Sequence, residues 1–110
     1  MPIVPPDIVL MMLGFFTVLG ALPLMLGRVR PNRIYGIRVE EAYASEQNWY
    51  AINKFGGSRF LRFGAIVAAE GLVLHQYPQA PYWVPIACMF AVLPLVLITV
   101  GAIKKYVRAL

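Results

Sequence analysis

Two long apolar runs without a charged residue constrain this chain more than any other feature. They cover residues 8–27 and 82–103, which is 20 and 22 residues. An α-helix rises about 1.5 Å per residue, so each run is long enough to cross the hydrocarbon core of a bilayer, which is about 30 Å thick. Both runs therefore predict transmembrane helices.

The charged residues are few, and the basic ones lie beside the apolar runs. Charged residues make up 14% of the chain and hydrophobic residues 60%. Soluble domains carry roughly a quarter charged residues. The formal net charge of +5 is explained by membrane topology and by anionic lipid headgroups. We therefore expect a lipid bilayer, and no nucleic acid, as the partner of the basic residues.

A third, weaker span is predicted for residues 58–77, which contain Glu70 near their centre. The distribution of basic residues supports this span. All ten lysines and arginines lie between Arg28 and Arg62 or after Ile103. With three spans, both basic groups face the same side of the membrane, as the positive-inside rule requires. We expect one all-α membrane domain, residues 1–110, with its N-terminus outside and its C-terminus in the cytoplasm.

A short helix is predicted between the first and second spans, at residues 46–55. Ser45 is a typical N-cap residue, and Glu46 places a carboxylate in the first turn, where it favours the helix dipole. Gly56 and Gly57 follow the helical spacing and predict the end of this helix.

The placement of this amphipathic helix has two interpretations. In the first, the helix lies on the inner membrane surface with Trp49 and Tyr50 at the depth of the headgroups. In the second, it packs beneath the bundle as a cap. The sequence does not separate them.

The cytoplasmic loop, residues 28–57, also carries a set of residues with long and characteristic spacing. A Pro-Asn pair precedes a Gly-Ile-Arg triplet, and an acidic residue, a tryptophan, an asparagine and two glycines follow. The set comprises Pro31, Asn32, Tyr35, Gly36, Ile37, Arg38, Glu46, Trp49, Asn53, Gly56 and Gly57. Over these roughly 27 residues, the chain resembles the signature of the SdpI family of small bacterial membrane proteins.

The resemblance implies a non-enzymatic role in the bacterial cytoplasmic (inner) membrane. The founding member of the family confers immunity to a secreted peptide toxin, and it takes part in membrane signalling that sequesters a transcriptional repressor. Family members usually have threonine-rich residues after the triplet, whereas this chain has Val-Glu-Glu-Ala at residues 39–42. Any function that depends on those hydroxyl groups does not transfer.

The motif residues suit a folded element. Asn32 after a proline favours a turn, and Gly36 allows a positive φ or close backbone approach. Arg33 and Arg38 can meet lipid phosphates or the carboxylates of the same loop. The alternative is a structural clamp without a ligand of its own.

Glu70 is the one carboxylate expected inside a span. Such a group usually faces the bundle interior, a water-filled cavity or a partner. It is interpreted either as a proton-titrating or ligand-contacting site, or as a structural carboxyl group that is hydrogen-bonded within the bundle or lies near enough to the outer interface to be hydrated. Small residues beside it form a surface that a second helix can approach closely: Gly64, Ala65, Ala68, Ala69 and Gly71.

No pattern for catalysis, cofactor binding or metal binding is present in the sequence. Cys88, the only cysteine, lies in an apolar run without a neighbouring base, and His75, the only histidine, marks the end of the second span. We therefore expect no enzyme activity, no cofactor and no metal.

The favoured hypothesis is an immunity or signalling protein that acts through the motif on its cytoplasmic face. It would act on a protein partner in the membrane or as a homo-oligomer. The first alternative is an accessory subunit of a larger membrane complex. The second is a proton- or solute-handling protein that uses Glu70.

Overall fold

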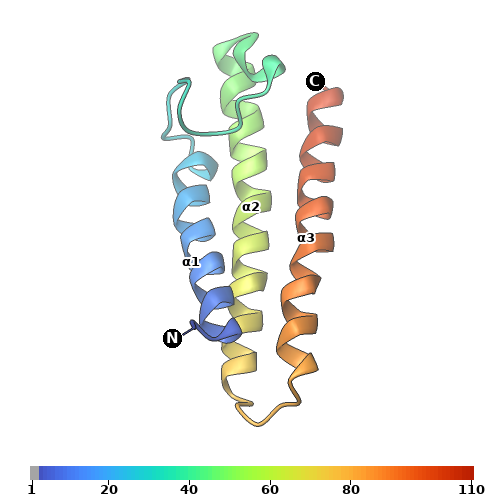
Figure 1. Ribbon diagram of the computed structural model, residues 1–110. Coiled ribbons are helices and arrows are strands. Elements are labelled where there is room, and N and C mark those ends of the chain that lie inside the picture. Colours follow the sequence, from blue (N-terminus) through green and yellow to red (C-terminus); the bar gives the residue numbers. More distant parts are fainter. Residues whose placement is uncertain (1–2) are drawn as a thin grey trace.

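The computed structural model describes residues 3–110, which form three long helices and one short 3-10 turn. The helices are α1 (Pro6–Met25), α2 (Glu46–His75) and α3 (Trp83–Arg108), and the turn η1 (Glu40–Tyr43) precedes α2. Figure 1 shows α2 between α1 and α3, with neighbouring helices antiparallel. The bundle is elongated, with extents of 52 × 23 × 23 Å. The all-α fold expected from the sequence is confirmed.

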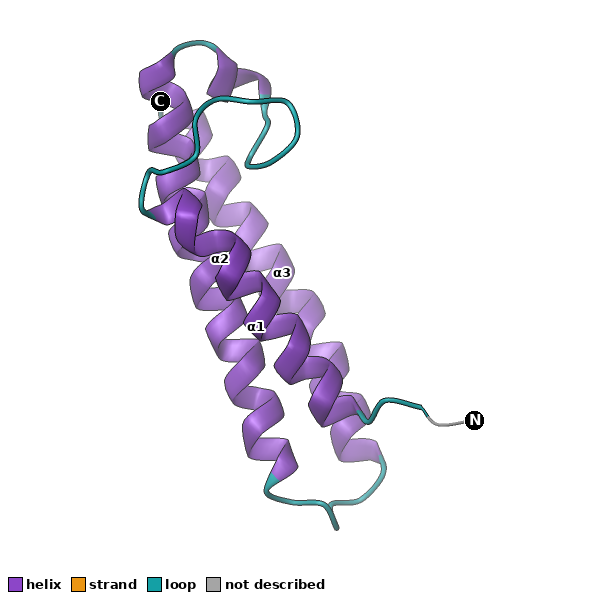
Figure 2. Cartoon of the chain, turned by 90° about the vertical axis from the view of Figure 1, so that its left-hand side faces the viewer, coloured by secondary structure: helices purple, strands orange, loops and turns teal. Residues whose placement is uncertain are grey.

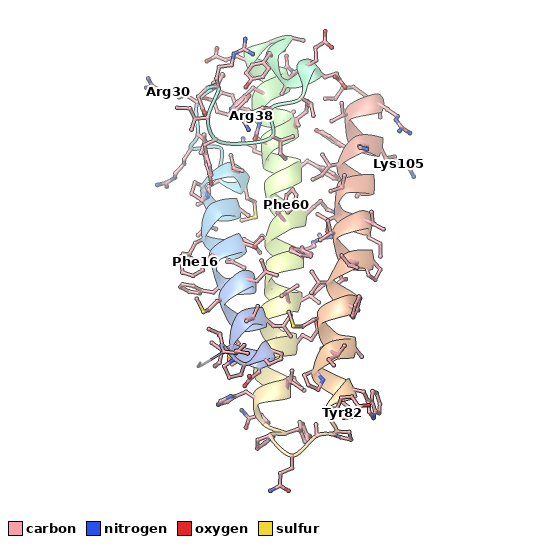
Figure 3. The ribbon with its side chains drawn as sticks, in the orientation of Figure 1. Phe16, Arg30, Arg38, Phe60, Tyr82 and Lys105 are labelled. Carbon is pink, nitrogen blue, oxygen red and sulfur yellow. The ribbon has the colours of Figure 1, made fainter. Side chains whose placement is uncertain are left out.

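Among the described residues, α1 and α3 are the two helices that are both long and apolar enough to cross a membrane. Their large side chains point outward: Phe16 of α1 is 60% exposed and projects from the bundle in Figure 3, and Leu97 of α3 is 72% exposed. The core helix of a soluble protein would bury such side chains. The helix α2 has 30 residues but carries four charged side chains after its first turn, Lys54, Arg59, Arg62 and Glu70.

The prediction of a separate short helix at residues 46–55 is wrong. Residues 46–55 form the first turns of α2, which continues without a break to His75, as Figure 2 also shows. Gly56 and Gly57 are buried in this helix, and neither has a positive φ. Glycine is needed at both positions because neighbouring segments pack directly against the helix backbone there. A Cβ on Gly56 would lie 1.8 Å from Ile37 Cδ1, and one on Gly57 would lie 2.6 Å from the backbone nitrogen of Met25.

A seam of glycines brings α1 and α2 into backbone contact. Gly57, Gly64 and Gly71 recur every seven residues along one face of α2. A Cβ on Gly64 would lie 2.8 Å from the carbonyl oxygen of Gly14, and one on Gly71 would lie 2.7 Å from that of Asp7. Small residues permit such close approach in membrane bundles. The small-residue face expected from the sequence is therefore covered by α1 at Gly64, Ala68 and Gly71, whereas Ala65 and Ala69 are exposed.

Two clusters of buried apolar side chains hold the helices together: the first joins η1, α2 and α3, and the second joins α1 and α2 and is covered by partly buried residues of α3. The cluster near the C-terminus of α3 consists of Ala42, Trp49, Ile52, Ile103 and Val107, and the second consists of Leu10, Phe63 and Val67. At the first cluster, the rings of Phe55 and Tyr106 stack with their centroids 4.2 Å apart. The first cluster lies at the end of the bundle where the 28–45 connection folds.

The close approach of α1 and α2 along the glycine seam leads to a prediction about stability. We expect Gly14→Ala to lower the free energy of unfolding by about 1–3 kcal/mol, the usual cost of overpacking. The added Cβ would lie 2.3 Å from the backbone nitrogen of Ala68, which cannot move aside as a side chain could. Unfolding by SDS titration in detergent micelles measures the change.

The matched control is Gly101→Ala in α3, where an added Cβ meets no atom within 4 Å. It should leave stability unchanged or slightly raised. Equal effects of the two substitutions would contradict the close approach of α1 and α2.

Candidate functional site

The motif residues of the loop and of α2 come together at the end of the bundle that carries the C-terminus of α3 (Figure 1). Asn53 is at their centre and is only 2% exposed. Its Oδ1 accepts a hydrogen bond of 2.7 Å from the backbone N–H of Ile37, and its Nδ2 donates to the carbonyls of Trp49, at 3.0 Å, and Ile37, at 3.4 Å. One side chain of α2 thus fixes the loop by both of its polar atoms. We call the folded segment 28–45 with the first turns of α2 the cap.

Trp49 is the largest side chain buried in the cap, with no exposed surface. Its Nε1 donates a hydrogen bond of 2.9 Å to the carbonyl of Val29, and its ring packs against Tyr43 at a centroid distance of 5.5 Å. The interpretation that places Trp49 at headgroup depth on a surface helix is therefore wrong. Trp49 lies inside because the loop folds over it, and Tyr50 beside it is half-buried.

Gly36 has both properties expected of it. Its φ is +119°, a conformation that residues with a side chain rarely adopt. A Cβ at this position would lie 2.8 Å from Oδ1 of Asn53 and 3.1 Å from the ring of Trp49. A glycine is required here so that the loop can approach α2.

Asn32 organises the turn expected after Pro31. Its Oδ1 accepts hydrogen bonds from the backbone N–H groups of Ile34, at 2.9 Å, and Tyr35, at 2.7 Å. Its own carbonyl accepts a 2.6 Å hydrogen bond from the hydroxyl of Tyr43. Tyr35, in turn, donates its hydroxyl to the carbonyl of Gly20 in α1 and so joins the loop to the first helix.

The start of α2 follows the sequence prediction. The Oγ of Ser45 accepts a 3.0 Å hydrogen bond from the backbone N–H of Asn48, which confirms Ser45 as the N-cap. Glu46 is exposed in the first turn. Its position suits the helix dipole, and its side chain lies outside the hydrogen-bond network of the cap.

Two arginines remain exposed on the outside of the cap. Arg38 donates a 2.6 Å hydrogen bond to the carbonyl of Arg33, and the guanidinium of Arg33 lies 4.2 Å from the centre of the Tyr43 ring. With Gly36 they line a shallow pocket of about 440 Å³, which we call the arginine pocket. Figure 3 shows Arg38 at this end of the bundle.

The carboxylates of the loop do not pair with these arginines. Within residues 3–110, the one ion pair closer than 4.0 Å joins His75 and Asp7. A guanidinium group has five N–H donors, so both arginines keep donors for a ligand. The arrangement suits a planar anionic group such as a carboxylate or a phosphate, which arginine binds in a bidentate manner.

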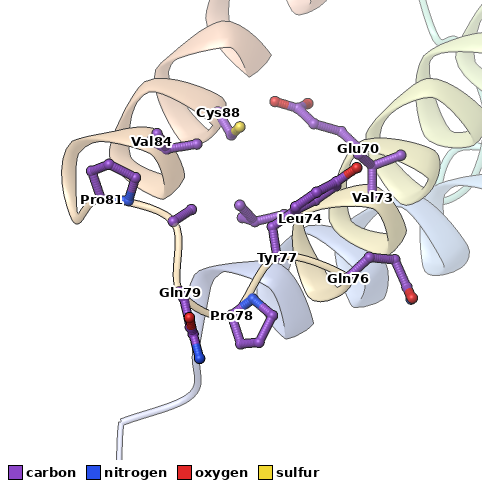
Figure 4. A pocket seen from close by; sticks show the side chains of 11 residues that line it. Glu70, Val73, Leu74, Gln76, Tyr77, Pro78, Gln79, Pro81, Val84 and Cys88 are labelled. Carbon is purple, nitrogen blue, oxygen red and sulfur yellow. The ribbon is translucent and has the colours of Figure 1, made fainter.

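The other polar residues singled out in the sequence lie at the opposite end of α2. Glu70 and Cys88 line a cavity of about 760 Å³ between α2 and α3, with the carboxylate and the sulfur pointing toward each other (Figure 4). His75 Nδ1 lies 2.7 Å from Oδ2 of Asp7 and so links the end of α2 to the start of α1. Across residues 3–110, no three potential metal ligands gather into a cluster.

Sequence reasoning missed the residues that hold the cap from outside the motif. Tyr43 contacts Trp49, Arg33 and Asn32, and Val29 supplies the acceptor for the indole N–H. An aromatic residue close to the motif was the available signal for Tyr43. The pair of Asp7 and His75 had no local signal, because 68 positions separate the two residues.

Comparison with known proteins gives the same family as the motif. Residues 28–103 match the model of the family described as the SdpI/YfhL protein family. The match includes the cap, all of α2 and most of α3. Neither the curated proteins nor the solved structures contain a match to the chain.

The role of Asn53 makes a prediction. We expect Asn53→Ala to lower the stability of the protein by about 1–3 kcal/mol, because it leaves the part-buried N–H of Ile37 without an acceptor. The loop should also become accessible, so trypsin should cut after Arg33 or Arg38 at least tenfold faster. Limited proteolysis in detergent with mass spectrometry of the fragments measures this rate.

The control for this prediction is Gln47→Ala, an exposed position six residues earlier in α2. It should leave the cleavage rate unchanged. Wild-type cleavage rates in Asn53→Ala would show that the loop is held by other contacts.

Proposed function

The chain belongs to the SdpI/YfhL protein family, and we propose that it is a three-span, non-enzymatic membrane protein that binds an anionic segment of a partner protein through the arginine pocket. Family membership and two apolar helices fit a membrane protein. The number of spans, the orientation and the mode of action are the proposal. The immunity or signalling role of the family is the biological setting in which we place it.

The arrangement of the helices supports three spans. The helix α2 lies between α1 and α3 and connects opposite ends of the bundle, since the loop after α1 is at one end and the loop before α3 is at the other (Figure 1). If α1 and α3 cross the bilayer side by side with α2, then α2 crosses it too. Its 30 residues extend about 45 Å at 1.5 Å per residue, which exceeds the hydrocarbon thickness.

The charged side chains of α2 fit this placement. The guanidinium of Arg59 lies 6.0 Å from the centre of the Phe55 ring, one turn closer to the cap. A long basic side chain near the end of a span extends in this way toward the headgroups. In Figure 3, Arg30, Arg38 and Lys105 lie at the cap end of the bundle and Tyr82 lies at the other end. The positive-inside rule then places the cap and the C-terminus in the cytoplasm.

The observation that carries the function is the pair of exposed arginines on a fixed frame. Arg33 and Arg38 are held by Tyr43 and by each other, and neither pairs with a carboxylate of residues 3–110. Because the frame is ordered before binding, a partner meets preorganised donors and loses less entropy on association. An acidic segment of a cytoplasmic or membrane partner has the chemistry that this pocket recognises.

The proposed topology predicts a labelling pattern. In a Cys88→Ser background, Gln79→Cys between α2 and α3 should react with a membrane-impermeant maleimide in intact bacterial cells. Glu41→Cys in the cap should react only after lysis. If α2 did not cross the membrane, both positions would share one side and would show the same accessibility.

The proposed binding site predicts a difference between two pairs of arginines. The double variant Arg33→Gln/Arg38→Gln should lose its co-purifying partner by at least tenfold, since each hydrogen bond to a charged group contributes about 1.5–3 kcal/mol. Expression of this variant should not rescue a deletion strain. The strain should keep its sensitivity to the cognate secreted toxin or its altered regulator activity. Purification from native membranes in mild detergent and toxin challenge provide the two measurements.

The matched control is Arg28→Gln/Arg30→Gln, which removes the same charge from exposed positions of the same loop outside the pocket. It should retain the partner and the phenotype. Equal loss in both double variants would point to a general charge effect and contradict the pocket. Larger membrane subunits that co-purify regardless of either change would favour an accessory-subunit role.

A further inference from the structure

We propose that the cavity beside Glu70 binds a lipid-soluble amine, with its ammonium group on the Glu70 carboxylate and its apolar body between α2 and α3. This site lies at the opposite end of α2 from the arginine pocket and does not depend on the proposed function. We call it the Glu70 cavity.

The Glu70 cavity is formed where α2 ends and α3 begins. Its volume of about 760 Å³ is within the range of about 300–1,000 Å³ that is typical of small-molecule sites. The walls are mainly apolar, and Figure 4 shows them around the carboxylate: Val73, Leu74, Tyr77, Pro78, Pro81 and Val84. An apolar ligand body can therefore replace lipid or water along most of this surface.

The charge of the cavity is unbalanced. Among residues 3–110, Glu70 is the only acidic residue that lines it, and no lysine, arginine or histidine of this range does. His75, the nearest basic residue along α2, is paired with Asp7. The thiol of Cys88 points toward the carboxylate, but a thiol is only a weak hydrogen-bond donor.

A carboxylate among apolar walls is costly unless a partner stabilises it. A ligand ammonium group would supply a charge-assisted hydrogen bond, which is strong in such surroundings. A neutral apolar ligand would fill the cavity and leave the carboxylate without a partner. One carboxylate and one thiol are too few ligands for a protein-bound zinc or calcium ion. The cavity therefore selects for a cation with an apolar body.

The test is equilibrium binding of radiolabelled decylamine to the full chain in phosphatidylcholine nanodiscs, with empty nanodiscs as the baseline. Saturable binding of one molecule per chain is expected. Decanol, which has the same chain length without the charge, should bind at least tenfold more weakly. Glu70→Gln should weaken decylamine binding at least tenfold, whereas Glu40→Gln, an exposed acid at the cap, should not change it.

A second variant separates loss of the site from loss of the fold. Val84→Phe keeps the carboxylate and fills the cavity, so it should also weaken decylamine binding while the helix content by circular dichroism stays at the wild-type level. In the wild-type protein, decylamine should protect Cys88, the only cysteine, from alkylation by N-ethylmaleimide. Equal affinity for decylamine and decanol, or unchanged decylamine binding in Glu70→Gln with normal helix content, would overturn the proposal.

Discussion

The side-chain amide of Asn53 is the interaction on which the architecture of the cap depends. It is buried on α2 and hydrogen-bonds both the N–H and the carbonyl of Ile37, which belongs to a loop with no regular structure of its own at this point. A buried backbone group must have a hydrogen-bond partner, and here one asparagine replaces a strand or a helix. This contact requires a residue without a side chain at Gly36, because a Cβ there would collide with Asn53. It also holds the loop over Trp49, which is therefore buried.

Those parts of the fold that depend on local patterns were predictable from the sequence. The charge-free runs predicted α1 and α3, and Ser45 predicted the start of α2. The turn at Asn32 and the positive φ of Gly36 also follow from local residue chemistry. The family resemblance was correct because it depends on residue types and their spacing along the chain, and the family model matches residues 28–103.

The features that could not be predicted from the sequence depend on contacts between distant segments. Gly56 and Gly57 looked like a helix end, because glycine is also the typical residue after a helix. Their small size instead serves contacts with Ile37 and α1, which no local pattern reveals. In the same way, Trp49 is a residue type typical of membrane-surface anchors, but its indole N–H is bonded to Val29, which lies 20 positions earlier in the chain. Glu70 was recognised as unusual, and only the packing of α3 shows that it lines a cavity with Cys88.

The most direct test of the central claim, that the family motif is an ordered cap fixed by Asn53, is hydrogen–deuterium exchange on the unmodified protein in nanodiscs. The N–H of Ile37, which donates a hydrogen bond to Oδ1 of Asn53, should exchange as slowly as amides in the middle of α2 and more slowly than the N–H of Arg33 in the same loop. Exchange of Ile37 at the rate of an unstructured peptide would contradict the account, because the loop would then be free and the arginine pocket would have no fixed frame.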